Sequence, residues 1–170
     1  ANPNEKVKVK EKEWAVWKRP EHEATEGKAM SKYVDIARAA EEADSEATEL
    51  LSFGSLVAKG KTANEIAGHT PGHTGFMLEA DGAQLFVMGD VVNAAVLQFA
   101  HPEWTVDFDV DPDAAVRSRK RNLDWAASER LMVAGMHFPF PGVGFVEKVK
   151  DGYRFVPSAW QHSFDEHKPS

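Results

Sequence analysis

The sequence predicts an α/β domain of the α+β kind, with antiparallel strands at both ends and a crossover helix between them. Two apolar runs, residues 74–80 and 83–90, flank Asp81-Gly82, which is the strongest short signal for a β-hairpin. A helical pattern begins at Asp111-Pro112 and is followed by the apolar run "RLMVAGMH". Strand, helix and strand in this order predict a crossover that makes two strands parallel.

Length and composition point to one soluble globular domain with no nucleic-acid partner and no membrane span. The chain has 170 residues, 42% hydrophobic and 28% charged, and a net charge of −7 that would repel a phosphate backbone. The basic cluster "RSRKR" at 117–121 is interpreted as a solvated helix face. No apolar run approaches the length of a membrane span and no signal-peptide pattern opens the chain.

The amino-terminal segment predicts a short edge strand followed by helices. Val7 and Val9 alternate with lysines, as in an exposed edge strand. Trp14 and Trp17 then have helical spacing. A further helix is expected from Ser31, after a polar loop at 21–30.

The hairpin register places two possible metal ligands, His73 and Asp90, opposite each other. A two-residue loop at Asp81-Gly82 pairs Ala80 with Ala83, so paired positions add up to 163. Extending this ladder places His73 opposite Asp90, and directly opposed Cβ atoms lie about 4.5–5.5 Å apart. That separation suits two ligands of one metal site or of two adjacent metals.

The second half of the chain predicts a helix over 112–130, a strand that ends at His137, and a hairpin turned at Asp151-Gly152. Asp111-Pro112 forms a good N-cap and first-turn pair. His137 stands at the carboxyl end of its strand, where α/β sheets hold their catalytic loops, and the stiff "FPFPG" loop follows it.

These positions make His73, Asp90 and His137 the candidate metal ligands. The chain has no cysteine, so any metal must use His, Asp or Glu, and the absence fits the cytoplasm and the periplasm equally. His69 is interpreted as a support for the turn or for the ligands. The aspartates of "VDFDVDPD" lack the remaining features of a calcium loop and are expected to serve as strand-end and cap residues.

With these residues in hand, the chain resembles the metallo-β-lactamase-fold hydrolases. "HTPGHTG", the Gly-Asp at 89–90 and "AGMHFPFPG" look like that superfamily's second, third and fourth metal motifs. "EKEWAVW", "GHTPGHTGF" and "DGYRFVP" look most like the methyl-parathion-hydrolase and lactonase-like branch. The resemblance implies an αββα sandwich, of which the single domain 1–170 supplies roughly the second, carboxy-terminal half.

The resemblance also implies roles for individual residues. His73 would bind a first divalent metal, which is zinc in the family. Asp90 would bridge two metals as the catalytic carboxylate, and His137 would bind the second. A water activated by two metals about 3.5–4 Å apart would attack a small ester, lactone or phosphotriester substrate. Trp17 and Tyr33 fall where that branch lines its substrate pocket.

One family motif does not occur in this sequence, and three hypotheses stay open. The string His-x-His-x-Asp-His, which supplies four of the family's metal ligands, is absent, and the chain begins without Met. We therefore expect a processed chain or a part of something longer. The first hypothesis is a hydrolase that needs an amino-terminal half. The second is a non-catalytic half-domain that uses its bare sheet face to bind itself or a partner. The expected partner on that face is a second copy in a homodimer or, under the first hypothesis, a separate amino-terminal half. The third is a mononuclear iron enzyme with two His and one carboxylate.

Overall fold

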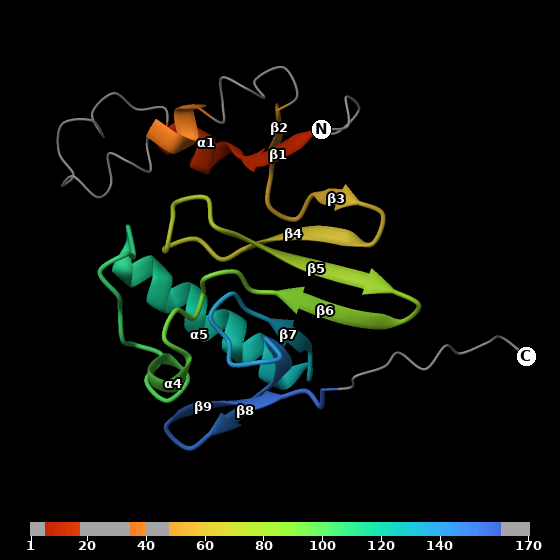
Figure 1. Cartoon of the computed structure of the whole chain (residues 1–170), viewed down its shortest axis with the longest axis vertical. Helices are drawn as coiled ribbons and strands as arrows, with labels where there is room; N and C mark the ends of the chain where they lie inside the picture. Colours follow the sequence, from red (N-terminus) through yellow and green to blue (C-terminus); the bar gives the residue numbers. More distant parts are fainter. Residues whose placement is uncertain (1–5, 18–34, 40–47, 161–170) are drawn as a thin grey trace, which may run out of the picture.

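The computed structural model describes residues 6–17, 35–39 and 48–160, which form two sheets and several helices (Figure 1). Its elements, in chain order, are β1 (Val7–Lys10), α1 (Glu11–Trp17), β2 (Thr48–Leu51), β3 (Leu56–Ala58), β4 (Lys61–Glu65), β5 (Thr74–Ala80), β6 (Ala83–Val87), α4 (Ala95–Gln98), α5 (Pro112–Ser128), β7 (Met132–Ala134), β8 (Val143–Val149) and β9 (Gly152–Pro157). Residues 35–39 are helical as well. Among the described residues, no helix combines the length and the apolar character that crossing a bilayer requires.

The main sheet has seven strands in the order β3-β4-β5-β6-β7-β8-β9. Its neighbouring strands are antiparallel except β6 and β7, which are parallel and are joined by the crossover that contains α4 and α5. The hairpin register is the predicted one, with Ala80 paired to Ala83 and Phe76 to Val87. The second hairpin turns one residue earlier than predicted, because Val149 pairs with Gly152 and leaves Lys150 and Asp151 in the turn.

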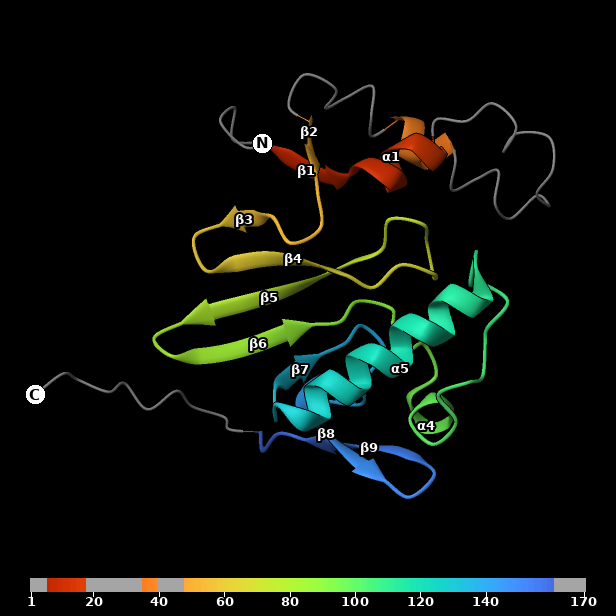
Figure 2. The same ribbon diagram turned by 180° about the vertical axis from the view of Figure 1, so that it is seen from behind.

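Helix α5 is the element that covers the sheet. Asp111 caps its first turn by accepting a hydrogen bond of 2.9 Å from the backbone N–H of Ala114, and Pro112 occupies the first helical position. Figure 2 shows α5 lying across the sheet on the side toward the viewer. Leu123 and Ala126 are fully buried there. Strand residues that face the helix complete this core, namely Met77, Phe86, Val133, Val146 and Tyr153.

The opposite sheet face is also apolar. The register places a continuous row of side chains across five strands on this face, Leu78, Leu85, Met132, Phe145 and Val156. All five are partly or largely exposed, although four of their five strands, β5 to β8, have a neighbouring strand on each side. In Figure 1, which views this side, no helix of the described residues crosses it. No helix within residues 6–17, 35–39 and 48–160 therefore supplies the cover that an apolar sheet face requires.

The amino-terminal layer touches the main body at the turn between β4 and β5. Strands β1 and β2 pair in parallel, which confirms the predicted strand, and α1 follows as the predicted helix. In α1, the Glu13 carboxylate accepts a hydrogen bond of 2.7 Å from the backbone N–H of Gly72. The helix is thus joined directly to the turn that carries the two histidines.

Candidate metal centre

The turn at residues 67–73 is held against the start of α5, and this fixes its two histidines. Gly68 has a φ of +135°, and a Cβ there would lie 2.1 Å from the backbone nitrogen of Ala115. Only glycine permits so close an approach of the two backbones. The Thr70 carbonyl accepts hydrogen bonds from the N–H groups of Gly68 and His73, at 3.0 and 3.2 Å. The turn is therefore rigid on both sides of its Pro-Gly pair.

His73 lies beside Asp90 as the register predicts, but its ring meets the backbone of Asp90 and not the carboxylate. Its Nδ1–H donates to the Ile66 carbonyl at 3.2 Å, and its Nε2 accepts the Asp90 backbone N–H at 3.1 Å. Burial lowers the pKa of the imidazole, and the neighbouring His69 adds to this effect. Both ring nitrogens therefore form hydrogen bonds with backbone groups, and neither is free to bind a metal in this arrangement. The role of His73 as a metal ligand stays a prediction.

Gly89 makes the approach of the His73 ring possible. Its φ is +53°, and a Cβ at this position would lie 2.6 Å from the His73 Nε2. Any larger residue would therefore push the ring away from the segment that carries Asp90. The two residues of the Gly-Asp pair therefore act together. Gly89 leaves room for the His73 ring, and Asp90 places its carboxylate beside His69 and His137.

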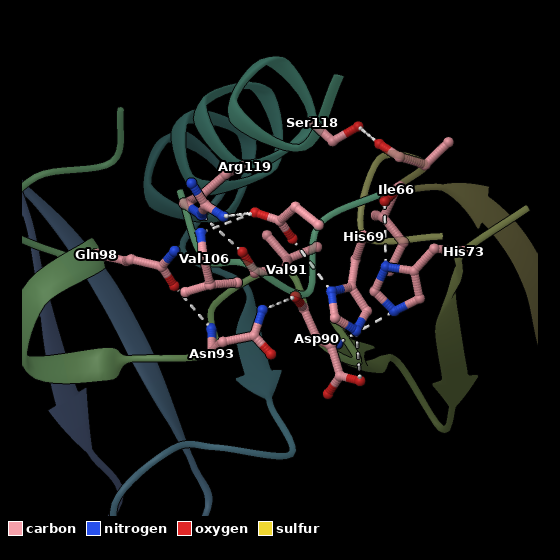
Figure 3. A network of polar contacts seen from close by, with 12 residues as sticks. Ile66, His69, His73, Asp90, Val91, Asn93, Gln98, Val106, Ser118 and Arg119 are labelled. Atoms are coloured by element: carbon pink, nitrogen blue, oxygen red, sulfur yellow. Dashed lines mark hydrogen bonds and ion pairs between the residues drawn. The ribbon is translucent and has the colours of Figure 1, made fainter. Parts of the chain in front are cut away.

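His69 is the turn residue whose free ring nitrogen faces the Asp90 carboxylate (Figure 3). Its Nδ1–H donates to the buried Asp109 Oδ1 at 3.1 Å, because a carboxylate can only accept. Its Nε2 lies 3.6 Å from Asp90 Oδ2. With the proton on Nδ1, Nε2 directs a lone pair at a carboxylate oxygen, an arrangement that a cation between them would stabilise.

His137 approaches the same carboxylate from the end of β7, as predicted. Its Nε2 lies 3.2 Å from Asp90 Oδ1. That oxygen is buried and has no partner with hydrogen-bond geometry among the described residues. A buried carboxylate oxygen without a hydrogen bond is costly, and a bound cation would satisfy it.

The residues present fit a divalent metal site in which Asp90 is shared. Two donors bound to one tetrahedral ion at about 2.0–2.2 Å lie roughly 3.4 Å apart, close to both observed separations. Each carboxylate oxygen faces a different imidazole, so the carboxylate can bridge two ions. In the described part of the chain, no three His, Cys, Asp or Glu side chains form one metal-binding group, so each ion would need further ligands.

Two supporting residues, Asp109 and Arg119, were not recognised from the sequence. Asp109 is 7% exposed and Arg119 only 1%, although Arg119 lies within the basic cluster interpreted as a solvated face. That interpretation is wrong for Arg119, because position 119 faces the loops that surround the site. Asp111 is the cap that we expected, whereas Asp109 bonds to His69. Charged side chains are almost never fully buried unless they are paired, so a sequence pattern alone did not distinguish Arg119 from its solvated neighbours.

Of the two predicted pocket residues, Trp17 lies in the described part of the chain. Trp17 ends α1 and donates its indole N–H to the Glu13 Oε1 at 2.6 Å. Since the other oxygen of Glu13 holds Gly72, Trp17 is tied to the turn through one carboxylate. Tyr33 lies outside the described residues. The lining of a substrate pocket by these two residues stays a prediction.

Comparison with known proteins identifies relatives by structure alone. No protein-family model and no curated protein matches the sequence. AidC, a dizinc quorum-quenching lactonase solved with a product bound, matches with a TM-score of 0.84 and 21% identity over 94% of this chain and 56% of its own. Hydrolase AbOPH of the beta-lactamase superfamily matches with a TM-score of 0.81 and 28% identity over 94% and 57%. A probable metal-dependent hydrolase from Staphylococcus aureus matches with a TM-score of 0.62 and 19% identity, over 90% and 53%.

Proposed function

Because the chain has the fold of metallo-β-lactamase-superfamily hydrolases over about half of their length, we propose that it supplies one part of a divalent-metal hydrolase site. The reaction class is cleavage of a small ester, lactone or phosphotriester. The observation that carries the proposal is the Asp90 carboxylate between two imidazoles, with one buried oxygen lacking a hydrogen bond. Neighbours that are described as a lactonase and as hydrolases support the same class.

The geometry supports a revised ligand set of His69, Asp90 and His137. His69 has the carboxylate–histidine arrangement that metal-binding imidazoles almost always show, with Asp109 as the carboxylate. His73 uses both nitrogens on backbone groups and thereby holds the Asp90 backbone in place. The two histidines of the turn thus have separate tasks: one faces the metal and the other orients its neighbour.

These residues would prepare the site for hydrolysis of a bound substrate. Two divalent ions, zinc in the dizinc neighbour, would supply Lewis acidity that lowers the pKa of water and polarises the substrate. Asp90 would hold the two positions at a fixed separation, because its two oxygens point to different imidazoles. His69 and His137 would contribute neutral nitrogen donors from either side. A mononuclear iron triad finds less support, since all three donors would have to share one ion.

We also propose that the open sheet face, defined by Leu78, Leu85, Met132, Phe145 and Val156, is covered by the part of the fold that this chain does not match in its neighbours. The chain aligns over 94% of its length but only 56–57% of those proteins. The same added part would bring the further ligands that each ion needs. A second copy of this chain on the same face, as in a non-catalytic half-domain, is the competing outcome.

Without the added part, His69, Asp90 and His137 should still bind a divalent ion, although weakly. Titration of the purified chain with an excess of Co²⁺, followed by its absorption spectrum, therefore tests the ligand set. Asp90→Asn should abolish binding, because a neutral amide bridges two cations poorly. His69→Ala and His137→Ala should each weaken binding strongly. His73→Ala should have a smaller effect, because it removes the support of a ligand.

Two results would contradict this proposal. Equal losses for His69→Ala and His73→Ala would return the ligand role to His73. A wild-type chain that binds no metal would favour the non-catalytic half-domain. A panel of chromogenic ester, lactone and phosphotriester substrates, tested with and without added zinc, then identifies the substrate class.

A further inference from the structure

Asp109 is a buried carboxylate whose two oxygens are both committed. Oδ1 accepts the Nδ1–H of His69 at 3.1 Å. Oδ2 accepts the backbone N–H of Val106 at 3.3 Å and lies 3.7 Å from the Nη2 of Arg119. Its side chain has no exposed surface, so the carboxylate can neither rotate into solvent nor exchange its partners.

Arg119 connects this carboxylate to the segment that carries Asp90. Its Nε donates to the Val91 carbonyl at 2.7 Å, and Val91 directly follows Asp90. Its Nη1 donates to the Pro102 and Trp104 carbonyls at 3.0 and 2.8 Å. Figure 3 shows the guanidinium on one side of the network and the His69 and Asp90 side chains on the other.

We propose that Asp109 and Arg119 form a positioning pair for the metal centre, a role that rests on the proposed function. Asp109 fixes the His69 ring with its hydrogen on Nδ1, so that Nε2 presents a lone pair to the site. Arg119 fixes Asp109 on one side and the backbone beside Asp90 on the other. Together, Asp109 and Arg119 thereby set the distance between the His69 imidazole and the Asp90 carboxylate, the two groups that would hold one ion.

Fold stability alone does not require a charged pair at positions 109 and 119. A buried ion pair is weak evidence for stability, because well-packed apolar residues of similar volume often stabilise a fold equally well. A charged acceptor on His69 Nδ1, in contrast, controls which ring nitrogen is free. The pair touches neither the substrate nor a metal and acts through His69 and the Asp90 segment.

The tautomer of His69 in the wild-type, metal-free chain is the first test. The ¹⁵N shifts of the neutral imidazole, measured by NMR, distinguish a hydrogen on Nδ1 from one on Nε2. The proposal expects the hydrogen on Nδ1. A hydrogen on Nε2 would overturn it, whatever the metal measurements show, so this result is independent of the proposed function.

Asp109→Asn supplies the second test, with Asp111→Asn as its matched control. A neutral amide can present either its oxygen or its NH₂ group to Nδ1, so His69 should gain a population with hydrogen on Nε2. Zinc affinity should fall by about 10–100-fold, the usual cost of losing such a partner. Asp111→Asn should change neither quantity, because asparagine also caps a helix.

The outcomes separate the two ideas. An Asp109→Asn chain with a dispersed NMR spectrum, an unchanged His69 tautomer and the zinc affinity of the control would overturn the positioning role. If Asp109→Asn does not fold, the wild-type tautomer decides the question alone. A wild-type chain with the expected tautomer but no zinc binding would refute the proposed function and leave the hydrogen-bond assignment of His69 intact.

Discussion

The two faces of the seven-stranded sheet carry similar residues in different environments. On the α5 face, Phe86 is fully buried, with its ring centroid 5.0 Å from that of Trp125. On the open face, Phe145 is 38% exposed, although its strand β8 lies between β7 and β9. Both faces have the apolar composition of buried strands, and only one of them has a covering element among the described residues.

This difference teaches that the covered face and the imidazole–carboxylate cluster around Asp90 are formed within the chain. The open face, in contrast, is not completed by the described residues. Helix α5 and the loops around Asp90 create the core and the imidazole–carboxylate cluster on their own. The open face retains the exposed apolar surface that marks an interaction site in soluble proteins.

The largest expected effect is on the free energy of unfolding. Phe86→Ala, on the covered face, should lower it much more than Phe145→Ala on the open face. Removing a fully buried phenylalanine costs about 3–5 kcal/mol, because it loses burial and leaves a cavity. The exposed Phe145 should cost less than about 1 kcal/mol in the isolated chain. Urea unfolding followed by circular dichroism gives both free energies of unfolding. Equal losses would mean that residues of this chain cover the open face.

A second effect is expected on association and not on stability. Without the added part, the open face of the isolated wild-type chain should bind a hydrophobic dye, and sedimentation at micromolar concentration should show weak self-association. A stable two-fold dimer would instead support the competing half-domain. Leu85→Lys places a charge in the middle of the open face and should reduce both dye binding and self-association. A compact wild-type monomer that binds no dye would show that the fold closes on itself, and the half-sandwich interpretation would then be wrong.

The smallest effect concerns the alkaline stability of the covered face. Burial and the hydrogen bond with Asp124 raise the pKa of Tyr153 above its ordinary value. The unfolded chain loses this proton near pH 10, before the folded chain does, so stability should decline as pH rises above about 10. Tyr153→Phe should remove this decline and leave the stability near neutral pH little changed. Urea unfolding at a series of alkaline pH values measures the difference, and identical pH profiles for the two proteins would contradict it.

Most of the fold follows from local signals in the sequence. Asp81-Gly82 set the register of β5 and β6 because a two-residue turn leaves no freedom in the pairing. The Asp111-Pro112 pair marked the start of α5 for a similarly local reason. The turn of the second hairpin was missed by one residue, because Lys150-Asp151 lacks a strong turn signature of its own. The helix expected from Ser31 falls mostly outside the described residues.

The side-chain contacts around Asp90 were predicted less completely than the strands, because the direction of a side chain depends on long-range contacts. The register correctly placed residue 73 beside residue 90, but it could not say whether the ring would meet the carboxylate or the backbone. The role of His69 depends on Asp109, which lies 40 residues further along the chain. No local pattern reports that contact. Arg119 was misjudged for the same reason, since helical charge clusters are usually solvated.

The parallel pairing of β6 with β7 has a consequence for the order of folding. Leu85 pairs with Met132, 47 positions away, whereas the two flanking hairpins pair neighbours in sequence. Closing so long a loop loses much chain entropy before any contact compensates for it, so we expect the two hairpins to form early and to join late. Asp90 follows β6 and His137 follows β7, so their meeting must wait for that last step. Metal ions present during refolding would therefore encounter separate, weak ligands first and the assembled pair only at the end.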